Sequence, residues 1–566
     1  RGLGDVYKRQ LYSCAVTLYD ENDACADKNT QRIGLRTLTV SREKDQWGEE
    51  FCFINNGVKI FAMGANYIPE DQIVTRCNEE KTRKLLADCK AANYNFIRVW
   101  GGGYYPDEYF YDYCDENGII VWQDFMFACS AYLLTEEFEE TVRGEVRDNV
   151  IRLRNHPSLG LWCGNNEIES AWEYWGLPED EEAKRDYLII FEDIIPQVLK
   201  AYDPCENTFY WPSSPSSGGG FKDASSNHAG DMHYWDVWHN FKPIEAFREF
   251  YYRFCSEYGF ESLPDIKTCR AFADETKGDF DLCSPVMEAH QKCAQGNEKI
   301  MYYLAQMVRY PYDFRQLIYS SQLVQADCIR SNVEHMRRAR GRCMGSAYWQ
   351  VNDSNPVISW SSIDCFGRWK GLHYYAKRFY APCLISCDDT HRKKPVLNIS
   401  NERMTAFEGV VKWTLRNNKA EILQSGEKSV NVPALTAQNV LDIDLSQELV
   451  SRTDPREKYL EYSIMENGRV LSFGTTLFVR PKEFTFLEPA ITYGISESED
   501  KFALTFCAEN YAKSVCLSLK TADCVFSDNW FDIHGKEPVT IMIDKASLSR
   551  KMTAQELSEE LEIMHN

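Results

Sequence analysis

The sequence predicts a multidomain protein with α/β and all-β parts, in which a (β/α)8 TIM barrel is flanked by immunoglobulin-like β-sandwich domains. Three observations predict this fold class. The chain has 566 residues, which is too long for one hydrophobic core. Short apolar runs alternate with amphipathic helical patterns between residues 48 and 383. From residue 384 onward, apolar side chains recur at every second position.

The first ten residues are left out of the fold prediction. Residues 5–10 resemble the translation of a sequencing-library transposon end, and no methionine begins the chain. We therefore interpret residues 1–10 as a sequencing artefact or tail and expect the chain to be truncated at its N-terminus. An ordinary polar tail is the alternative.

Residues 11–47 are predicted to be the C-terminal remnant of an immunoglobulin-like β-sandwich. Strand-like runs at residues 11–18 and 33–40 lie on either side of a polar loop rich in Asp and Asn. Two strands are too few to make a stable module by themselves. This segment is therefore expected to have lost the rest of its domain.

Residues 48–383 are predicted to form the barrel. Helical periodicity and end signals predict helices at residues 85–92, 106–118, 138–150 and 321–340. Gly118 is expected to end the second of these as a left-handed cap. The predicted strands are residues 58–65, 95–100, 119–124, 159–163, 208–211, 231–234, 253–256 and 343–349. Eight strands alternating with helices favour a closed barrel over an open sheet.

Residues 384–566 are predicted to form two further β-sandwiches. Val411, Trp413 and Leu415 alternate with polar residues, so that one face of the strand is apolar. The same alternation returns at residues 502–506, 515–519 and 539–543. A break near residues 480–482 divides this part into domains at 384–481 and 482–566.

Composition and missing motifs exclude several function classes. A net charge of −22 makes nucleic acid and anionic membrane surfaces unsuitable partners, and no apolar run is long enough to span a bilayer. The 21 cysteines are scattered, without C-x-x-C pairs or Cys/His clusters at metal spacing, so we expect no metal and a reducing, cytoplasmic compartment. Phosphate-loop and dinucleotide motifs are absent, so we expect no cofactor.

Polar and aromatic residues stand at the carboxyl ends of the predicted barrel strands, which is the face where TIM barrels place their active sites. They are Asn66, Arg98, Trp100, Asp124, Asn166, Glu167, His233, Tyr234, Glu257 and Trp349. Two of them, Glu167 and Glu257, are carboxylic acids on well-separated strands. Closure of the barrel would bring these two strand ends together across its mouth.

Two carboxyl groups are what the hydrolysis of an acetal needs. A neutral one protonates the leaving oxygen, and a charged one attacks the anomeric carbon. A retaining enzyme holds them about 5–5.5 Å apart, and like charges that close raise one pKa. A single glutamate at a strand end is more often an ion-pair or capping residue. Here Glu167 and Glu257 both end apolar strands, which favours the acid-pair interpretation.

Several motifs around these acids resemble those of glycoside hydrolase family 2. Residues 162–167, Trp-Cys-Gly-Asn-Asn-Glu, are similar to the family's acid/base signature, and residues 254–259, Phe-Cys-Ser-Glu-Tyr-Gly, to its nucleophile segment. The sequence is similar to the β-mannosidase branch in particular at residues 96–103, 122–126, 348–353, 360–364 and 527–531. The resemblance covers nearly everything after residue 10. Each motif alone is weak, and together they are specific.

The resemblance implies a retaining exo-β-mannosidase that removes terminal β-D-mannose through a covalent intermediate. Glu167 would be the acid/base and Glu257 the nucleophile. Asn166 would hold the sugar 2-hydroxyl, which is axial in mannose. Arg98 would keep Glu257 ionised, with an ordinary ion pair as the alternative.

The remaining site residues carry weaker expectations. Trp100, Trp235 and Trp349 are expected to form sugar platforms, with core packing as the alternative for each. Asp124 is expected to bind a sugar hydroxyl, unless it caps the next helix. His233 is expected to orient Tyr234 or to contact the sugar, and no metal ligands are expected.

Two rival functions and several questions stay open. The first rival is another family 2 exo-specificity, namely β-galactosidase, β-glucuronidase or glucosaminidase. The second is a non-catalytic carbohydrate-binding protein, against which the presence of both acids counts. Family members begin with a jelly-roll and a complete immunoglobulin-like domain, so we expect this chain alone to be poorly active or unstable and its full-length parent to be active. The natural β-mannoside and the oligomeric state stay undetermined.

Overall fold

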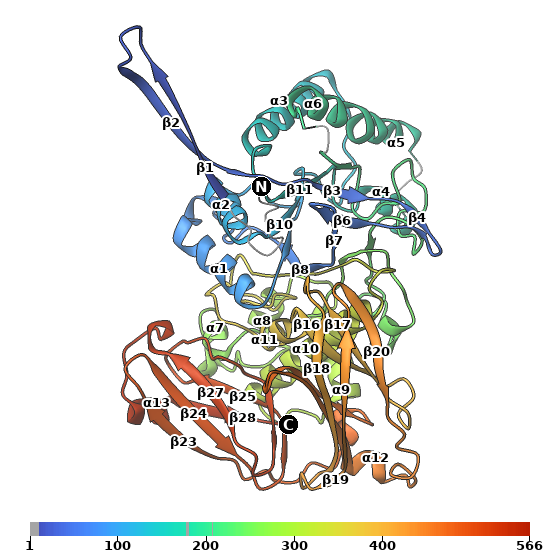
Figure 1. The fold of residues 1–566 in the computed structure, drawn as a ribbon, viewed down its shortest axis with the longest axis vertical. Helices are drawn as coiled ribbons and strands as arrows, with labels where there is room; N and C mark the ends of the chain where they lie inside the picture. Colours follow the sequence, from blue (N-terminus) through green and yellow to red (C-terminus); the bar gives the residue numbers. More distant parts are fainter. Residues whose placement is uncertain (1–10, 177–179, 206–207) are drawn as a thin grey trace. The chain divides into compact units, whose positions relative to one another are not determined.

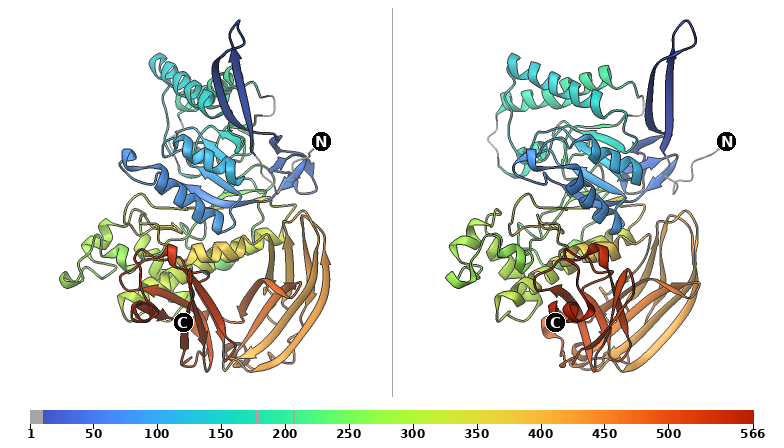
Figure 2. Two further views of the ribbon diagram at one scale, coloured as in Figure 1. Left: turned by 60° about the vertical axis from the view of Figure 1, so that its left-hand side comes forward. Right: turned by 90° about the vertical axis from the view of Figure 1, so that its left-hand side faces the viewer.

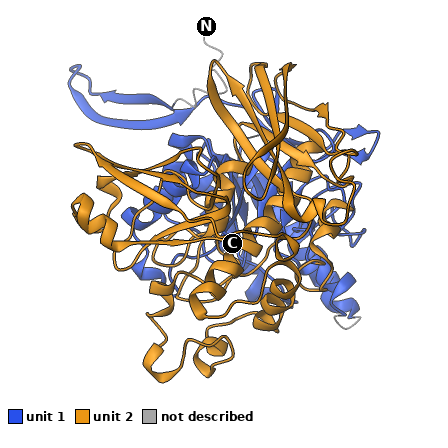
Figure 3. Ribbon diagram, turned by 90° about the horizontal axis from the view of Figure 1, so that it is seen from below, with its two compact units in different colours: residues 1–235, 250–258, 341–351 blue, residues 236–249, 259–340, 352–566 orange. Residues whose placement is uncertain are grey.

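The computed structural model describes residues 11–176, 180–205 and 208–566, so the segment interpreted as an artefact lies outside the described part. The chain forms two compact units, which Figure 3 colours separately. The first contains the chain up to Trp235 together with residues 250–258 and 341–351. The second contains residues 236–249, 259–340 and 352–566. Each unit is therefore built from segments that are separated in sequence.

The first unit contains a parallel barrel sheet of eight strands, which confirms the predicted barrel. The strands are β8 (Ala62–Tyr67), β9 (Phe96–Val99), β10 (Ile120–Asp124), β11 (Leu159–Cys163), β12 (Tyr210–Trp211), β13 (Met232–His233), β14 (Cys255–Glu257) and β15 (Gly345–Tyr348). They follow one another in chain order, and β15 pairs with β8. Between β12 and β13 the ring is completed by an isolated bridge, Ser216 with Asp231, rather than by a regular ladder.

The predicted strands match the barrel in order, but their bounds differ. The run expected at residues 58–65 is wrong as one strand, because β7 (Val58–Ile60) turns back on β6 (Cys52–Asn55) and β8 begins only at Ala62. The turn between β6 and β7 contains Asn56 and Gly57, both with positive φ. Later barrel strands are shorter than their apolar runs, because few of their residues pair with both neighbours.

Helices follow the first four barrel strands in the first unit. They are α1 (Glu79–Ala91), α2 (Glu108–Asn117), α3 (Glu136–Leu153), α4 (Ile168–Tyr174), α5 (Glu181–Leu188), the π-helical η2 (Ile189–Ile194) and α6 (Ile195–Tyr202), with the short η1 (Val74–Arg76) before them. Gly118 ends α2 with φ 60°, as predicted. The start of α2 was predicted two residues too early, because Asp107 is its N-cap and Pro106 precedes the cap.

Residues 11–60 form small antiparallel sheets before the barrel. β1 (Leu11–Tyr19) and β2 (Cys25–Gly34) make a hairpin that projects from the rest of its unit (Figure 2). The run predicted at residues 33–40 is wrong as one strand: β2 ends at Gly34, and β3 (Leu38–Ser41) pairs with β6 instead. β2 itself arises from the segment expected as a polar loop, whose side chains are exposed. A further short pair is β4 (Lys44–Asp45) with β5 (Gly48–Glu49).

One apolar cluster fixes these small sheets to the barrel. Leu38 and Val40 of β3 and Phe53 of β6 pack with Phe96 and Trp122 from the barrel strands. Phe51, Phe254 and the remaining members of the cluster are also nearly inaccessible to solvent. The barrel interior is thus a packed core, and polar chemistry is left to the carboxyl ends of its strands.

The second unit contains the remaining helices. They are η3 (Ile244–Arg248), α7 (Ile266–Cys269), η4 (Glu275–Lys277), α8 (Pro285–Ala289), α9 (Gly296–Met307), α10 (Phe314–Arg338), α11 (Gly371–Phe379), α12 (Asp454–Glu457), η5 (Pro481–Glu483), η6 (Lys545–Ser547) and α13 (Ala554–Glu560). The long helix predicted at residues 321–340 is α10, which begins earlier because Asp313 caps it through the backbone of Gln316.

Antiparallel sheets complete the second unit, as the period of two predicted (Figure 1). Their strands are β16 (Cys383–Asp388), β17 (Val396–Asn401), β18 (Phe407–Asn417), β19 (Ile422–Val432), β20 (Thr436–Asp442), β21 (Lys458–Glu466), β22 (Arg469–Leu477), β23 (Thr492–Glu497), β24 (Lys501–Cys507), β25 (Tyr511–Leu519), β26 (Phe531–His534), β27 (Val539–Asp544) and β28 (Leu561–Met564). Val411 and Leu415 are fully buried in the core that is formed by the three-stranded sheet β16–β17–β20 and the four-stranded sheet β19–β18–β21–β22. Among the described residues, the helices include none with the length and apolar character to cross a membrane.

Candidate active site

The carboxyl ends of the barrel strands bring most of the predicted polar residues together. Arg98 of β9, Asp124 of β10 and Glu257 of β14 are each at most 4% exposed. His233 ends β13, and Glu167 follows β11 after three residues. These residues come from five different strands, and the contacts described below join all of them.

Glu167 is positioned by the turn that leads from β11 into α4. Its backbone is left-handed, with φ 62°, and it is the N-cap residue of α4. Its N–H donates to the carbonyl of Ser214 at 2.7 Å, while the neighbouring Asn165 side chain accepts from the N–H of Ile168. The Glu167 side chain makes no capping hydrogen bond to α4 and is bonded to His233 instead.

The two predicted acids lie close together, with His233 between them. One carboxylate oxygen of Glu167, one of Glu257 and a ring nitrogen of His233 lie within 4.8 Å of one another. His233 Nδ1 is 2.8 Å from Glu167 Oε1 and 3.4 Å from Glu257 Oε2. A separation of at most 4.8 Å between these carboxylate oxygens is compatible with the spacing of roughly 5–5.5 Å in retaining glycosidases and shorter than the inverting spacing of roughly 6.5–9.5 Å.

Arg98 is the cation of the site and is completely buried. Its Nη1 donates to Asn66 Oδ1 at 2.8 Å and to Glu257 Oε1 at 2.5 Å. Its Nη2 donates to Asp124 Oδ2 at 2.8 Å and to Asn166 Oδ1 at 2.7 Å. One guanidinium thus holds four strand ends in register, and Asp124 is engaged with it rather than capping a helix.

Burial raises the pKa of both acids, and nearby charges oppose the effect. Burial raises the pKa of Glu167 to about 7, and Arg98 and hydrogen bonds from Cys129 and Asn166 oppose this only in part. Burial also raises the pKa of Glu257, against the opposing effects of His233 and Arg98. Burial lowers the pKa of His233 to about 4, so the imidazole is neutral at neutral pH.

The predicted aromatic residues divide into two groups. The half-buried rings of Trp100 and Trp349 meet edge to face with centroids 4.9 Å apart. The Tyr234 ring instead packs against Phe250 and Tyr252, although its N–H donates to the carbonyl of Glu257. Trp235 is half-buried two residues after the end of β13, and its platform role stays a prediction.

Four residues contact the acids or His233 directly or through one neighbour, and the sequence did not identify them. Cys129 Sγ lies 3.7 Å from Glu167 Oε2 and accepts from Asn166 Nδ2 at 3.3 Å. Ser214, Asp231 and Ser256 form a buried group behind His233. Ser214 and Ser256 stand at or near the carboxyl ends of predicted strands, and Asp231 stands at the start of one, but none of these residue types is rare enough there to be noticed without coordinates.

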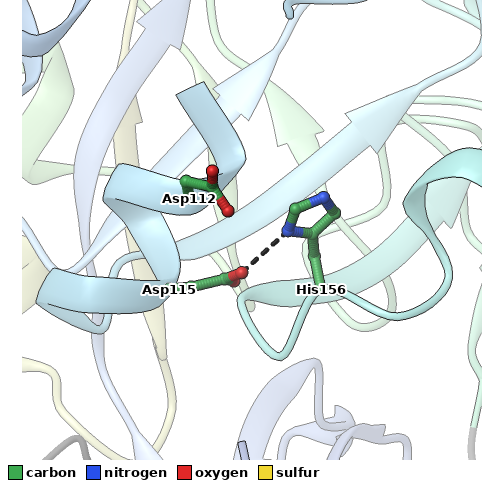
Figure 4. A group of neighbouring side chains, drawn as sticks. All are labelled: Asp112, Asp115 and His156. Carbon is green, nitrogen blue, oxygen red and sulfur yellow. Dashed lines mark hydrogen bonds and ion pairs between the residues drawn. The ribbon is translucent and has the colours of Figure 1, made fainter. Parts of the chain in front are cut away.

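A second group of acids and a histidine lies elsewhere in the first unit (Figure 4). Asp112 and Asp115 are on α2, and His156 follows α3. His156 Nδ1 is 2.7 Å from Asp115 Oδ2, and its Nε2 is 3.1 Å from Glu108 Oε2. Both ring nitrogens therefore already have carboxylate partners, and the group connects α2 with the segment that leads into β11.

Comparison with known proteins gives consistent matches. A Mannosidase Ig/CBM-like domain model matches residues 394–483, and an Ig-fold domain model matches residues 486–566. Beta-mannosidase B of Aspergillus terreus is 31% identical over 563 residues, which cover 94% of this chain and 66% of that protein. Beta-mannosidase B of Aspergillus fumigatus is 35% identical over 434 residues, which cover 74% of this chain and 50% of that protein. The chain therefore spans between half and about two thirds of the length of these relatives.

Solved structures agree with this match. The β-D-mannosidase of Dictyoglomus thermophilum superposes with a TM-score of 0.89 and 30% identity, over 98% of this chain and 66% of that chain. The exo-chitosanase of Amycolatopsis orientalis superposes with a TM-score of 0.74 over 98% of this chain and 68% of that chain. At 15% identity, the second comparison shows a shared fold alone.

Proposed function

This chain belongs to the β-mannosidase branch of glycoside hydrolase family 2, and we propose that its protein is a retaining exo-β-mannosidase acting on terminal β-D-mannose. The observation that carries the proposal is the placement of Glu167 and Glu257, from strands β11 and β14, around one imidazole within 4.8 Å. Such a spacing suits attack on one anomeric carbon by one acid while the other reaches the departing oxygen.

In the first step, Glu257 is the nucleophile and Glu167 the acid. A carboxylate oxygen of Glu257 bonds to the anomeric carbon as the glycosidic C–O bond breaks, and the Glu167 proton passes to the leaving oxygen. Burial that raises the Glu167 pKa to about 7 supports this role, because a substantial fraction of the group is then protonated near neutral pH. The product is a mannosyl ester on Glu257 and a free aglycone.

In the second step, Glu167 is the base. Its carboxylate takes a proton from water as the water oxygen bonds to the anomeric carbon and the ester bond to Glu257 breaks. Two displacements at the same carbon leave its configuration unchanged. Glu257 is released as a carboxylate, and the 2.5 Å hydrogen bond from Arg98 stabilises that charge.

The other polar residues are assigned to sugar binding and positioning. Asn166 is assigned to the sugar 2-hydroxyl, with its carbonyl oxygen held by Arg98 so that its amide nitrogen faces Cys129. Asp124 is assigned to a neighbouring hydroxyl, and His233 contacts both acids. Trp100 and Trp349 form an aromatic corner suited to a sugar face, and Trp235 is assigned to a platform. Tyr234 supports the site from the packed side of β13.

A substrate panel tests the proposal on the full-length protein. We expect turnover of 4-nitrophenyl β-D-mannoside and at least about tenfold lower kcat/KM on the β-galactoside and β-glucuronide. Preference for either rival sugar would move the protein to another specificity of the family. Absence of turnover on all three would favour a binding protein.

Labelling and substitution test the acid roles. A 2-deoxy-2-fluoro-β-mannosyl fluoride should form a stable ester on Glu257, identified by peptide mass spectrometry. Glu257→Ala should reduce turnover to background, and wild-type activity in this variant would exclude Glu257 as nucleophile. Glu169→Gln is the matched control, because this buried acid on α4 accepts from the Phe221 N–H and is not in the acid pair.

We also propose that the protein works in a reducing compartment such as the cytoplasm. All 21 cysteines are described, and each is a free thiol. Buried thiols such as Cys163 of β11 and Cys255 of β14 pack as small apolar side chains. Fractionation of the native host with thiol labelling would test this.

A further inference from the structure

Asp231 lies behind the site and accepts hydrogen bonds from four donors. Its side chain is completely buried. Trp211 Nε1 donates to Oδ1 at 2.8 Å and the Ser216 N–H donates to Oδ1 at 3.0 Å. The hydroxyls of Ser214 and Ser256 donate to Oδ2, the first at 2.6 Å. A carboxyl group that receives four donors is an ionised acceptor.

The hydroxyl of Ser214 has one proton, and this geometry assigns that proton to Asp231. The 2.6 Å contact with Asp231 is shorter than the contacts of the same oxygen with His233 Nε2 at 3.0 Å and Ser256 Oγ at 3.4 Å. An ionised carboxylate has no proton to offer, so Ser214 must be the donor to it. Towards His233, Ser214 Oγ is then only an acceptor, and Nε2 must carry a hydrogen.

The tautomer of His233 decides what Glu167 can do. A neutral imidazole with its proton on Nε2 has a bare lone pair on Nδ1. That Nδ1 lies 2.8 Å from Glu167 Oε1, a distance that requires a proton between the two atoms. With a neutral His233, this proton belongs to Glu167.

We propose that Ser214 and Asp231 are positioning residues that hold His233 in its Nε2–H tautomer, so that the imidazole accepts from Glu167 and keeps Glu167 in its acid form. Neither residue touches the reacting atoms. Their effect passes through one imidazole to one carboxyl group. The inference deepens the proposed function, and it rests on Glu167 being the acid of that function.

The other charged and titratable groups that face this pair act on it as well. Arg98 lowers the pKa of Glu167, and Glu257 raises the pKa of His233. The Cys129 thiol donates to the second carboxylate oxygen of Glu167, Oε2. These groups are the same whichever tautomer His233 adopts. The tautomer is therefore the variable that Ser214 and Asp231 control.

Loss of this control should convert Glu167 from an acid into a hydrogen-bonded carboxylate. Without the Ser214 oxygen, His233 can place its proton on Nδ1 and donate to Glu167 Oε1. A donor at 2.8 Å favours the ionised carboxylate and lowers its pKa. In Asp231→Asn, the amide can donate to Ser214, which then donates to Nε2 and produces the same tautomer change.

Aryl β-mannosides with different leaving groups test the proposal, because a good leaving group needs no proton. In Ser214→Ala we expect kcat/KM on phenyl β-mannoside to fall by at least about tenfold, and on 2,4-dinitrophenyl β-mannoside to change by less than about twofold. The basic limb of the pH profile on the phenyl substrate should move down by about one pH unit. Asp231→Asn should repeat this pattern.

The test has a matched control variant and defined results that would overturn the proposal. Ser217→Ala is the matched control, because its hydroxyl donates to the Asp223 carbonyl on the same loop, away from His233. Equal losses on both substrates, or an unchanged pH profile, would overturn the proposal. Nitrogen-15 NMR of the His233 ring gives a readout without turnover: an Nδ1–H signal in the wild type would also overturn it. Failure of the proposed function would instead appear as no mannosidase activity in the wild type.

Discussion

Arg98 compensates the buried negative charges of the site. It is fully buried and contacts two buried carboxylates, Asp124 and Glu257, as well as two amide oxygens. A buried ion pair contributes little net stability, but removing one partner leaves an uncompensated charge in a low dielectric. Removing Arg98 should therefore lower the free energy of unfolding by more than its ion pairs contribute to it.

Substitution of Arg98 should destabilise the protein as well as inactivate it. We expect Arg98→Met to lower the free energy of unfolding by about 3–5 kcal/mol, measured by urea denaturation. Arg83→Met is the control, because Arg83 makes partly exposed ion pairs with Glu79 and Glu116, and we expect a loss of at most about 1 kcal/mol. A difference of less than about 1 kcal/mol between the two variants would contradict this account.

Single residues differ in how far the sequence predicted them. Glu167, Glu257, Arg98 and Asp124 were predicted from their positions at strand ends. The structure brings Arg98 into contact with Asp124 and Glu257, and His233 joins Glu167 to Glu257. Ser214 and Asp231 were missed, because their importance comes from hydrogen bonds across strands β12 to β14. The left-handed backbone of Glu167 was also beyond the sequence, since glutamate carries no signal for positive φ.

Helix α2 and the segment after α3 are joined by the His156 cluster. The imidazole bonds to Asp115 and Glu108 on α2, and its ring lies 5.2 Å from that of Tyr111. Burial disfavours the charged imidazole, but the hydrogen bonds and charges of Asp115 and Glu108 outweigh it and raise the pKa of His156. The folded chain therefore binds this proton more tightly than the unfolded chain.

This cluster makes the stability of α2 depend on pH. The contribution of protonated His156 is fully present below about pH 6.5 and is lost as the pH rises through the raised pKa. We expect the difference in Tm between the wild type and His156→Gln to be larger at about pH 6 than at about pH 9. The exposed His391→Gln should show no such trend, and a difference that grows with pH would contradict the assignment.

Elements differ in predictability according to their length. Long periodic segments such as α3 and α10 gave clear signals, and β10 and β11 were predicted to within one residue. β12, β13 and β14 contain only two or three residues each, so their ends depend on pairing with neighbours rather than on an apolar run. Helices α4 to α6 were missed because no single apolar period runs through them, and a π-helical turn interrupts the series.

At the scale of the whole molecule, the β1–β2 hairpin exposes apolar side chains. Val16 and Leu18 share one face of β1 and are 65% and 62% exposed. In the described part of the chain, β1 and β2 pair only with each other. Open strand edges and an exposed apolar face favour association with another chain.

Charge placed on this face should reduce association of the chain. We expect Val16→Lys combined with Leu18→Lys to lower the weight-average mass measured by static light scattering towards that of one chain. Ser13→Lys, on the opposite face of β1, is the control and should leave the mass nearly unchanged. A wild-type chain that is monomeric at all concentrations would contradict the prediction.

The division into two units could not be predicted from the sequence. Apolar periodicity reveals strands and helices, but the segments 250–258 and 341–351 join the first unit through strand pairing and packing with residues elsewhere in the chain. The domain limits at residues 10, 47, 383 and 481 therefore stay predictions, whereas the barrel and the antiparallel sheets are confirmed. Local pattern specifies elements, and their assembly depends on contacts that the pattern does not encode.

The pairing of β8 with β15 also has a consequence for how the protein is made. β8 ends at Tyr67, and β15 begins only at Gly345. At translation rates of roughly 5–20 residues per second, the ribosome needs on the order of ten seconds to a minute to deliver that neighbour. During this interval the nascent first strand has an open hydrogen-bonding edge. Synthesis in the cell is therefore the period in which this barrel most needs protection by a chaperone.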